Sequence, residues 1–262
     1  MNARALRVLI GPVSLLALVA AAPRADAAWR PDTKAAVAYI HTRVGQISFA
    51  VRTERRVWGH HRTDAVHSLS VVKALLLVAY LDDPRVRRRP LTAADRKLID
   101  PMIRRSDNES ATKVLAYVGA RRVQRTARRV GMRRFRLDPL VWGGSRIDAS
   151  DQTRFFLHLD AHVVARHRAT ALRLLGTVVP EQRWGIGRAR PDGWRLYFKG
   201  GWGDGANIPD HQVALLTYGA DRVAVAVLTT GNPSNAYGNE TLRGVFARLL
   251  RGLAARSVLT PL

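Results

Sequence analysis

The residues best suited to chemistry begin with a serine and a lysine three positions apart. Ser70 and Lys73 stand at the start of residues 71–80, a run that is apolar on nearly every side and predicts a buried helix. A lysine there opposes the helix dipole and is desolvated by its neighbours, which should lower its pKa. Because residues i and i+3 share a helix face, such an amine can accept the proton of a serine hydroxyl. The spacing indicates a serine nucleophile with a lysine base, and a plain helix N-cap is the structural alternative.

Two further short motifs follow along the chain. The triplet Ser106-Asp107-Asn108 falls in an expected turn between two helices. Serine, aspartate and asparagine are also the best helix-capping residues, so an N-cap is the alternative interpretation. A Lys-Gly-Gly motif begins at Lys199 and ends an expected strand, where a simple glycine turn would also fit. Each motif alone is weak, and their order along the chain is what favours a shared site.

Hydrophobic periodicity predicts the scaffold that must position these motifs. The two terminal segments supply five strands and two flanking helices, with an all-helical block inserted between them. We predict an α/β (α+β) fold with a five-stranded antiparallel sheet from residues 28–69 and 189–262, and an all-helical domain of residues 70–188. The expected helices are 33–44, 71–80, 92–104, 109–119, 121–130, 150–165, 168–178 and 239–256; the strands are 47–53, 56–60, 194–199, 211–218 and 222–229; residues 137–149 form a loop.

Composition narrows the class of protein further. The 262 residues include 43 Lys plus Arg against 20 Asp plus Glu and no cysteine. The absence of cysteine excludes disulfide scaffolds, thiol nucleophiles and iron–sulfur clusters. Only five of the 43 cations are lysines, so Lys73 and Lys199 use a scarce residue. The arginine-rich runs 85–89, 121–136 and 243–256 contain too few aromatic residues to stack bases, which favours solvated faces and no nucleic-acid partner.

The first 27 residues predict export. Arg4 and Arg7 form a positive region, residues 8–22 an apolar core, and a small-x-small cleavage site ends at Ala27. An uncleaved membrane anchor is the alternative. Cleavage would remove three Arg and one Asp and leave a net charge of +21. We expect a secreted or cell-envelope location, where anionic cell-surface polymers are candidate partners.

In this order, the three motifs resemble those of the penicillin-recognising serine enzymes, most closely the class A β-lactamase group. The resemblance covers nearly the whole chain after residue 27 and implies the β-lactamase/transpeptidase-like fold. It implies that Ser70 is the acylated nucleophile and Lys73 its proton partner. Ser106 would relay a proton to the leaving nitrogen. Asn108 would bind the substrate amide and hold Lys73.

The third motif has implied roles as well. Lys199 would provide the electrostatic field that acts on Ser106 and on an anionic substrate group. Gly200, Gly201 and Trp202 would line the substrate site. The resemblance further implies an oxyanion hole formed by the backbone N–H groups of Trp202 and the nucleophile.

The sequence departs from the family pattern in three places. Class A β-lactamases present Glu-x-x-Leu-Asn on a loop, whose Glu activates the water that clears the acyl-enzyme, but residues 137–148 contain no Glu. Asp138 and Asp148 are candidate substitutes, and each also fits a turn or a cap. Gly200 replaces the hydroxyl residue that grips the substrate carboxylate. The segment between Lys73 and Ser106 is also short. These departures leave acylation intact and predict weak or altered β-lactam turnover.

The spacing of the residues does not match the motifs of other types of active site. Ile147 stands where a Gly-x-Ser-x-Gly elbow needs its second glycine, which argues against an α/β-hydrolase. His158 and His162 lie four residues apart, but Leu159 occupies the position of a zinc protease's glutamate. We therefore interpret both histidines as surface or core residues and expect no metal.

Together these features predict an exported, class A β-lactamase-like serine hydrolase that forms an acyl-Ser70 intermediate on a β-lactam or related amide. We expect a monomer that needs no cofactor and acts on a small-molecule β-lactam or a cell-wall peptide. Two alternatives stay open. One is a penicillin-binding-type cell-wall D,D-peptidase or esterase, and the other is a non-catalytic basic module that binds the envelope.

Overall fold

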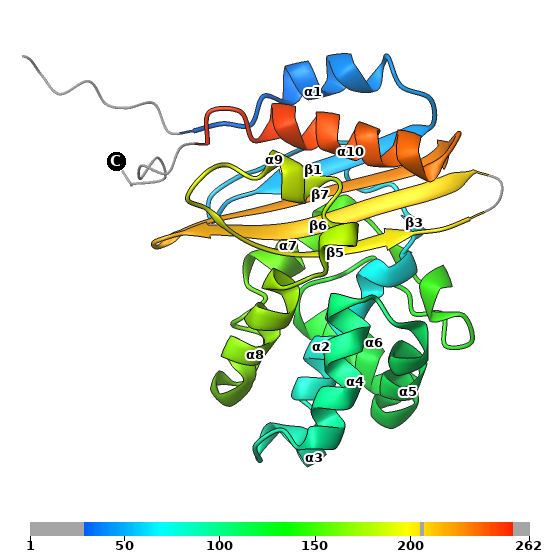
Figure 1. Cartoon of the computed structure of the whole chain (residues 1–262), viewed down its shortest axis with the longest axis vertical. Coiled ribbons are helices and arrows are strands. Elements are labelled where there is room, and N and C mark those ends of the chain that lie inside the picture. Colours follow the sequence, from blue (N-terminus) through cyan, green and yellow to red (C-terminus); the bar gives the residue numbers. More distant parts are fainter. Residues whose placement is uncertain (1–28, 205–206, 254–262) are drawn as a thin grey trace, which may run out of the picture.

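The central layer of the fold is a single five-stranded sheet (Figure 1). The computed structural model describes residues 29–204 and 207–253, so the predicted signal segment 1–27 lies outside the described residues. The strands pair in the order β2-β1-β7-β6-β5 and every pairing is antiparallel, which confirms the predicted sheet and places β5 at one edge. The strands are β1 (Gln46–Arg52), β2 (Val57–His60), β5 (Arg195–Trp202), β6 (Ile208–Tyr218) and β7 (Asp221–Asn232).

Two helices from opposite ends of the sequence cover one face of this sheet. α1 (Thr33–Ile40) and α10 (Asn235–Leu249) pack against each other, and α10 also contacts β6 and β7 (Figure 1). Phe49, Val225 and Phe246 belong to the apolar core between these helices and the sheet. The helical block covers the opposite face. Burial on both faces explains why β6 and β7 are apolar at consecutive positions rather than alternate ones.

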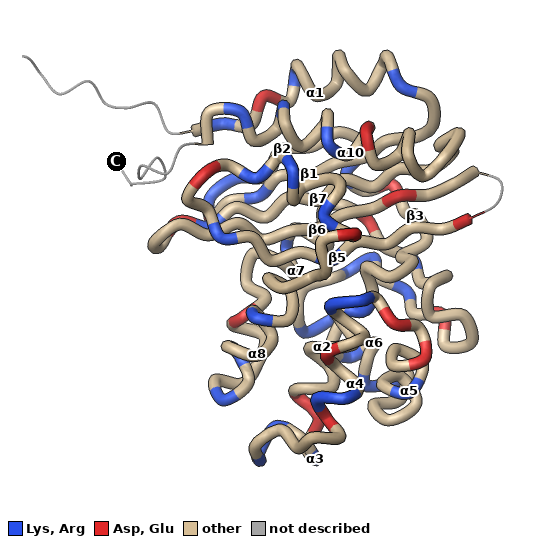
Figure 2. The backbone as a smooth tube through the Cα atoms, viewed as in Figure 1, with Lys and Arg blue, Asp and Glu red and all other residues tan. Residues whose placement is uncertain are grey.

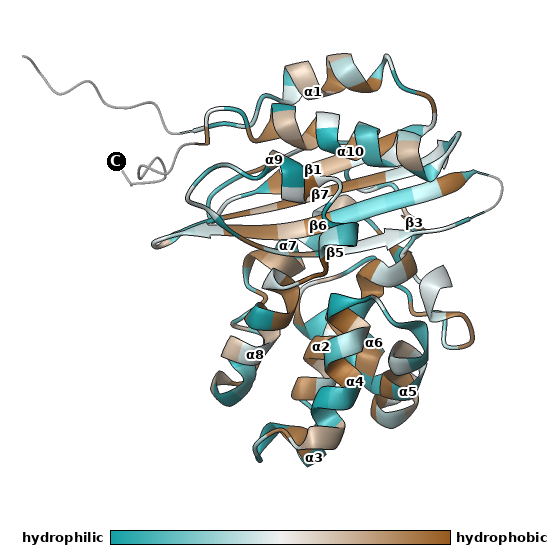
Figure 3. Cartoon of the chain, in the orientation of Figure 1, coloured by the Kyte–Doolittle hydropathy of each residue, from teal (hydrophilic) through white to brown (hydrophobic). Residues whose placement is uncertain are grey.

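α2 (Lys73–Leu81) forms the centre of the helical block. All its residues are buried, as its all-round apolar sequence predicted, and Figure 3 shows it as a mostly hydrophobic helix within the block. It contacts α4, α5, α6 and α8, whereas α7 packs beneath β1 and β7. The remaining helices are η1 (Leu69–Val72), α3 (Pro84–Arg87), α4 (Ala93–Arg104), α5 (Asn108–Val118), α6 (Ala120–Arg129), η2 (Trp142–Gly144), α7 (Ala149–Leu157), α8 (Ala165–Gly176), η3 (Pro180–Gln182) and α9 (Ile186–Ala189).

Some element ends differ from the sequence prediction. α7 ends at Leu157 rather than near residue 165, because Arg222 of β7 donates to the Leu157 carbonyl and pairs with Asp160. This contact joins segments far apart in sequence, so local periodicity could not indicate it. The predicted loop 137–149 contains η2 and β4 (Arg146–Ile147), which pairs with β3 (Val66–His67). The predicted helix 71–80 begins with the 3₁₀ turn η1.

Lys and Arg positions are spread over the whole fold, including the helical block (Figure 2). α6 illustrates the arrangement, because Val123 and Ala127 are buried while Arg121, Arg125 and Arg128 are exposed. These three arginines of the run therefore lie on an exposed face of α6, as expected. In the part of the chain that the structure describes, no helix is long and apolar enough to cross a membrane.

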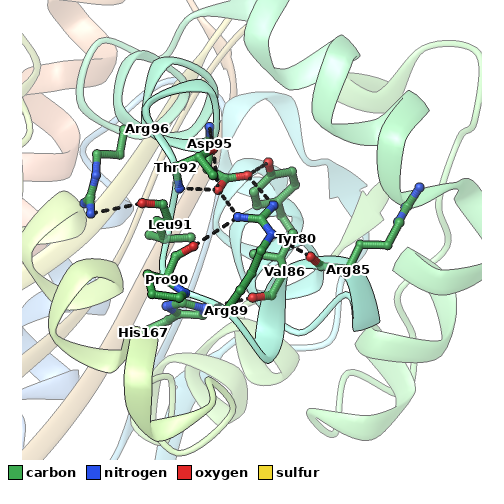
Figure 4. Close-up of polar contacts among 10 residues, drawn as sticks. All are labelled: Tyr80, Arg85, Val86, Arg89, Pro90, Leu91, Thr92, Asp95, Arg96 and His167. Carbon is green, nitrogen blue, oxygen red and sulfur yellow. Dashed lines mark hydrogen bonds and ion pairs between the residues drawn. The ribbon is translucent and has the colours of Figure 1, made fainter.

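A buried carboxylate ties α2 to α4 (Figure 4). Asp95 closes a capping box with Thr92 at the start of α4. The Tyr80 hydroxyl donates to the Asp95 Oδ1 at 2.6 Å, and the Arg89 guanidinium donates to both carboxylate oxygens of Asp95. These donors hold the pKa of Asp95 well below its usual range, with the Arg89 hydrogen bond as the largest cause. The network therefore fixes the helix that carries Lys73 relative to the next helix.

Replacing Asp95 with alanine should lower the free energy of unfolding by about 3 kcal/mol, because it removes a cap and leaves the buried Tyr80 hydroxyl without its acceptor. Asp100→Ala in the same helix is the control, since Asp100 makes only partly exposed ion pairs and should cost less than about 1 kcal/mol. Urea denaturation measures both values. The Asp95 contribution is present above the unfolded pKa of about 3.9 and is lost as the pH falls below it. Equal losses in the two variants would contradict the prediction.

Candidate active site

Ser70 lies between the edge strand of the sheet and the first turn of α2. It belongs to η1, which packs against β5 and leads directly into α2. The preceding residue, Leu69, has a φ of 47°, in the left-handed region that non-glycine residues rarely adopt. Backbone strain of this kind is concentrated at functional sites. The half-buried Ser70 thus has the setting of a reactive residue.

Lys73 is fully buried one turn after Ser70. Its Nζ donates to the Ser106 carbonyl at 2.5 Å, to the Asn108 Oδ1 at 2.7 Å and to the Ser106 Oγ at 3.3 Å. The Trp142 ring covers the same amine, with its centroid 4.7 Å from Nζ. Burial lowers the pKa of Lys73 to about 7, although the charge of Asp107 opposes the shift. At neutral pH much of this lysine is therefore an uncharged amine that can accept a proton.

Ser106 and Asn108 reach Lys73 from the turn between α4 and α5. Ser106 has a φ of 61°, and this left-handed residue reverses the chain so that its carbonyl and hydroxyl both face the amine. Asp107 caps α5 by accepting from the Ser110 N–H. The triplet is therefore both a helix cap and part of the candidate site, because Asp107 caps α5 and its two neighbours contact Lys73.

Lys199 reaches Ser106 from β5. It is fully buried, and its Nζ donates to the Ser106 Oγ at 2.9 Å and to the Gly200 carbonyl at 2.8 Å. The centroid of the Trp202 ring lies 5.9 Å from this amine. Burial, followed by the charge of Lys73, lowers the pKa of Lys199 well below its ordinary value. Two amines from distant segments thus converge on one serine hydroxyl.

β5 passes so close to Ser70 that only glycine fits at position 201. A Cβ on Gly201 would lie 2.9 Å from the Ser70 nitrogen. The Gly203 N–H donates to the Pro209 carbonyl, so it faces β6. Because N–H groups alternate in direction along an antiparallel strand, the Trp202 N–H faces away from β6, toward the open edge. The N–H groups implied for the oxyanion hole therefore come from two closely packed segments.

The edge of β5 also has an aromatic wall. The rings of Trp184 and Trp202 meet edge to face with centroids 6.4 Å apart, and Trp202 is 37% exposed. A Cβ on Gly200 would meet Trp184, Gln212 and a backbone oxygen at 3.6–3.7 Å, which is ordinary contact. Glycine at position 200 is therefore not required by space, unlike at position 201. The structure brings all eight residues named from the sequence into this one region.

The two acids of the loop 137–148 are committed to structural roles. Asp138 accepts from the backbone N–H groups two and three residues ahead, as a turn residue does. Asp148 is fully buried, caps α7 and forms a two-pronged ion pair with Arg134. Asp148 is therefore not free to replace the missing glutamate and fits the cap interpretation, and Asp138 uses its Oδ1 as a turn residue.

Sequence reasoning missed two buried serines that hold this loop against the nucleophile. The Ser68 N–H donates to the Ser145 carbonyl at 2.6 Å, and the Ser68 hydroxyl contacts the carbonyls of Trp142 and Gly143. The Ser145 hydroxyl donates to the Trp142 carbonyl. These residues fix the Trp142 ring over Lys73. Isolated serines in polar stretches have no periodicity, so nothing in the sequence marked them.

The histidine pair has no metal-site geometry. His162 stacks on Phe155, and burial lowers its pKa to about 4, whereas His158 pairs with Glu54. Across residues 29–204 and 207–253, no group of three or more His, Cys, Asp or Glu side chains could hold a metal ion.

Comparison with known proteins identifies the family to which this chain belongs. A model of the Beta-lactamase enzyme family matches residues 87–252, more than half of the chain. The chain belongs to this family. It is therefore a serine hydrolase that acts on amide bonds. The matched range includes Ser106, Asn108 and Lys199 but begins after Ser70 and Lys73. No curated protein matches the sequence of this β-lactamase family member.

Solved structures support the same fold. A β-lactamase from Xanthomonas campestris superposes with a TM-score of 0.74 at 15% identity, covering 85% of this chain and 97% of that one. One from Sphaerobacter thermophilus gives 0.72 at 20% identity, covering 88% and 98%. A class A β-lactamase from Mycobacterium abscessus gives 0.71 at 19% identity, covering 85% and 99%. These likenesses confirm the β-lactamase fold of this chain.

Acylation of this family member should accelerate as the pH rises through about 7, the pKa of Lys73. Below that pKa the amine is protonated and has no lone pair, so the rate should fall about tenfold per pH unit. Stopped-flow measurement of the acylation rate against pH tests this. Lys73→Arg stays charged and should react slowly with no inflection near 7. An unchanged profile in that variant would exclude Lys73 as the base.

Proposed function

We propose that this protein is an exported active-site-serine hydrolase that forms an acyl-Ser70 intermediate on a β-lactam or a related amide. The observation that supports this most directly is the convergence of Lys73 and Lys199 on the Ser106 hydroxyl, beside Ser70 and the edge of β5. One amine on the helix that follows Ser70 supplies a base, and a second amine on β5 supplies a hydrogen-bond donor to Ser106. Burying two lysines costs free energy, and a non-catalytic member of this fold would gain nothing that offsets this cost.

The proposed acylation uses groups already in place. Uncharged Lys73 accepts the Ser70 proton as Oγ attacks the substrate carbonyl. The backbone N–H groups of Ser70 and Trp202 stabilise the oxyanion. Ser106 donates its proton to the leaving nitrogen and receives one from the protonated Lys73, so the amide C–N bond breaks with the proton count balanced. The Lys199 amine keeps its hydrogen bond to the Ser106 hydroxyl throughout and so orients it.

Deacylation is the weak step of this site. Asp138 and Asp148 are engaged in a turn and in an ion pair, and the Trp142 ring lies over Lys73. Among the described residues of the site, Lys73 is the candidate left to activate water, and it is partly protonated at neutral pH. This observation favours a second candidate function, a penicillin-binding-type D,D-peptidase or esterase whose acyl-enzyme is long-lived toward β-lactams.

The residues around Ser70 also indicate which kind of substrate the site would bind. The Asn108 amide, held by Lys73, is exposed and can meet a substrate amide. The fully buried Lys199 amine donates to Ser106, and Gly200 offers no hydroxyl for an anionic substrate group. The indoles of Trp184 and Trp202 favour a substrate with an apolar or aromatic part. A small-molecule β-lactam or a cell-wall peptide meets these conditions.

Intact-mass measurement after incubation with benzylpenicillin or a fluorophosphonate tests the proposal. We expect one covalent adduct on the wild-type protein and none on Ser70→Ala. Ser48→Ala is the matched control, since the Ser48 hydroxyl is buried without a partner in the described structure and its loss should leave the adduct intact. Rapid release would indicate a β-lactamase, and a stable adduct the penicillin-binding candidate. If neither probe forms a Ser70-dependent adduct, the catalytic proposal fails.

Export is part of the same proposal. The first 27 residues have the charge and apolar pattern of a secretory signal, and cleavage after Ala27 would release a chain that begins at residue 28. Mass measurement of the protein recovered from the medium and from the envelope of an expressing bacterium tests this. Full-length protein retained in the membrane fraction would instead indicate an uncleaved anchor.

A further inference from the structure

A cavity of about 800 Å³ lies in the helical block, beside α3 and the junction of α5 and α6. α3 is at the end of the block remote from the sheet (Figure 1), so the cavity is separate from the site at Ser70. Four arginines and one carboxylate line it, together with small and apolar residues. The charged lining residues are Asp83, Arg85, Arg121, Arg122 and Arg125.

Two of these arginines are held in place by a buried acid. Asp83, whose side chain is 2% exposed, accepts from Arg85 at 2.8 and 3.1 Å and pairs with Arg122 at 3.3 Å. Arg85 also stacks on the Tyr117 ring, 3.8 Å from its centroid, and donates to the Tyr117 carbonyl. The Arg85 hydrogen bonds keep the pKa of Asp83 below its usual range, so the acid stays charged. The guanidinium groups are thereby oriented before any ligand arrives.

The other two arginines leave positive charge uncompensated. Arg121 and Arg125 are exposed, and among the described residues neither has an ion-pair or hydrogen-bond partner. They lie four residues apart on α6, where like charges repel and destabilise the helix. The cavity lining thus has four cations against one anion, an excess that an anionic ligand would neutralise.

We propose that this cavity binds a phosphate group, supplied either as a free phosphorylated ligand or as a lipid headgroup. Planar guanidinium groups match phosphate oxygens with paired hydrogen bonds, and arginine is the usual residue for this recognition. Binding here would hold the enzyme to a phosphate-bearing surface by the end of the helical block and leave the site at Ser70 open. The proposal does not depend on the chemistry at Ser70.

Charge variants with a matched control test the phosphate site. Arg121→Glu combined with Arg125→Glu reverses two cavity charges. Arg55→Glu combined with Arg56→Glu makes the same change in net charge at the exposed turn between β1 and β2. Calorimetric titration with tripolyphosphate probes a free ligand, and sedimentation with phosphatidylglycerol–phosphatidylcholine vesicles probes a headgroup. We expect the cavity pair to weaken binding about tenfold or more, and the control pair about twofold or less.

A second measurement guards against misfolded variants. Tripolyphosphate should raise the melting temperature of the wild-type and control proteins, because its binding relieves the repulsion between the cavity arginines. The milder double variant Arg121→Gln and Arg125→Gln no longer has this repulsion. Tripolyphosphate should therefore raise the melting temperature of that variant less. Loss of tripolyphosphate binding in the cavity pair supports a free ligand, and loss confined to vesicles supports a headgroup. Equal weakening in both pairs, or no binding of either probe at low salt, would overturn the proposal.

Discussion

Replacing Gly201 with alanine is expected to slow acylation of Ser70 about 10²–10³-fold, the usual effect of losing one oxyanion donor. The added Cβ would lie 2.9 Å from the Ser70 nitrogen and 3.0 Å from the Leu69 Cβ. Backbone atoms cannot rotate away as a flexible side chain can, so β5 must move back from η1. That shift withdraws the Trp202 N–H from the substrate oxygen. The acylation rate with benzylpenicillin or a fluorophosphonate measures the effect.

The neighbouring glycine provides the matched control. A Cβ on Gly200 meets its nearest atoms at 3.6–3.7 Å, which is ordinary van der Waals contact. Gly200→Ala should therefore acylate at close to the wild-type rate. Thermal melting of both variants separates loss of geometry from loss of fold. If Gly201→Ala acylated as fast as Gly200→Ala, the oxyanion hole would not lie between Ser70 and β5.

Introducing glutamate at position 143 is expected to accelerate release of the acyl-enzyme about 10²–10⁴-fold, the usual contribution of a general base. Gly143 lies in the loop that covers the site, and only the Leu69 Cα falls within 4 Å of its missing Cβ, at 3.7 Å. A side chain there is sterically allowed and points toward the residue before the nucleophile. It would supply a carboxylate that neither a turn nor an ion pair engages.

Gly143→Gln is the control for this variant, because it has the same size and no basic carboxylate. The lifetime of the acyl adduct, followed by intact mass after removal of excess probe, distinguishes the two. We expect a shorter lifetime only with glutamate. Equal lifetimes in both variants would show that position 143 does not reach the water that attacks the acyl group.

Much of the candidate site could be predicted from residue types alone. A lysine at the start of an all-round apolar helix has no structural purpose, and the structure shows Lys73 buried with a pKa of about 7. The scarcity of lysine also pointed to Lys199. The alternation and length of apolar runs predicted the five strands and most of the helices, because these patterns reflect which faces are buried.

The sequence by itself thus predicted the layered fold and proposed Ser70 and Lys73 as nucleophile and base, since each prediction depends on local spacing and on the burial of apolar faces. The tertiary structure decided the contacts between distant segments. Ser106 receives hydrogen bonds from two lysines, 33 and 93 residues away in sequence. Gly201 is required by an approach of β5 to Ser70 that no local pattern reports. The commitment of Asp138 and Asp148 likewise depends on where the loop packs, because a carboxylate becomes a base or a cap according to the donors that surround it.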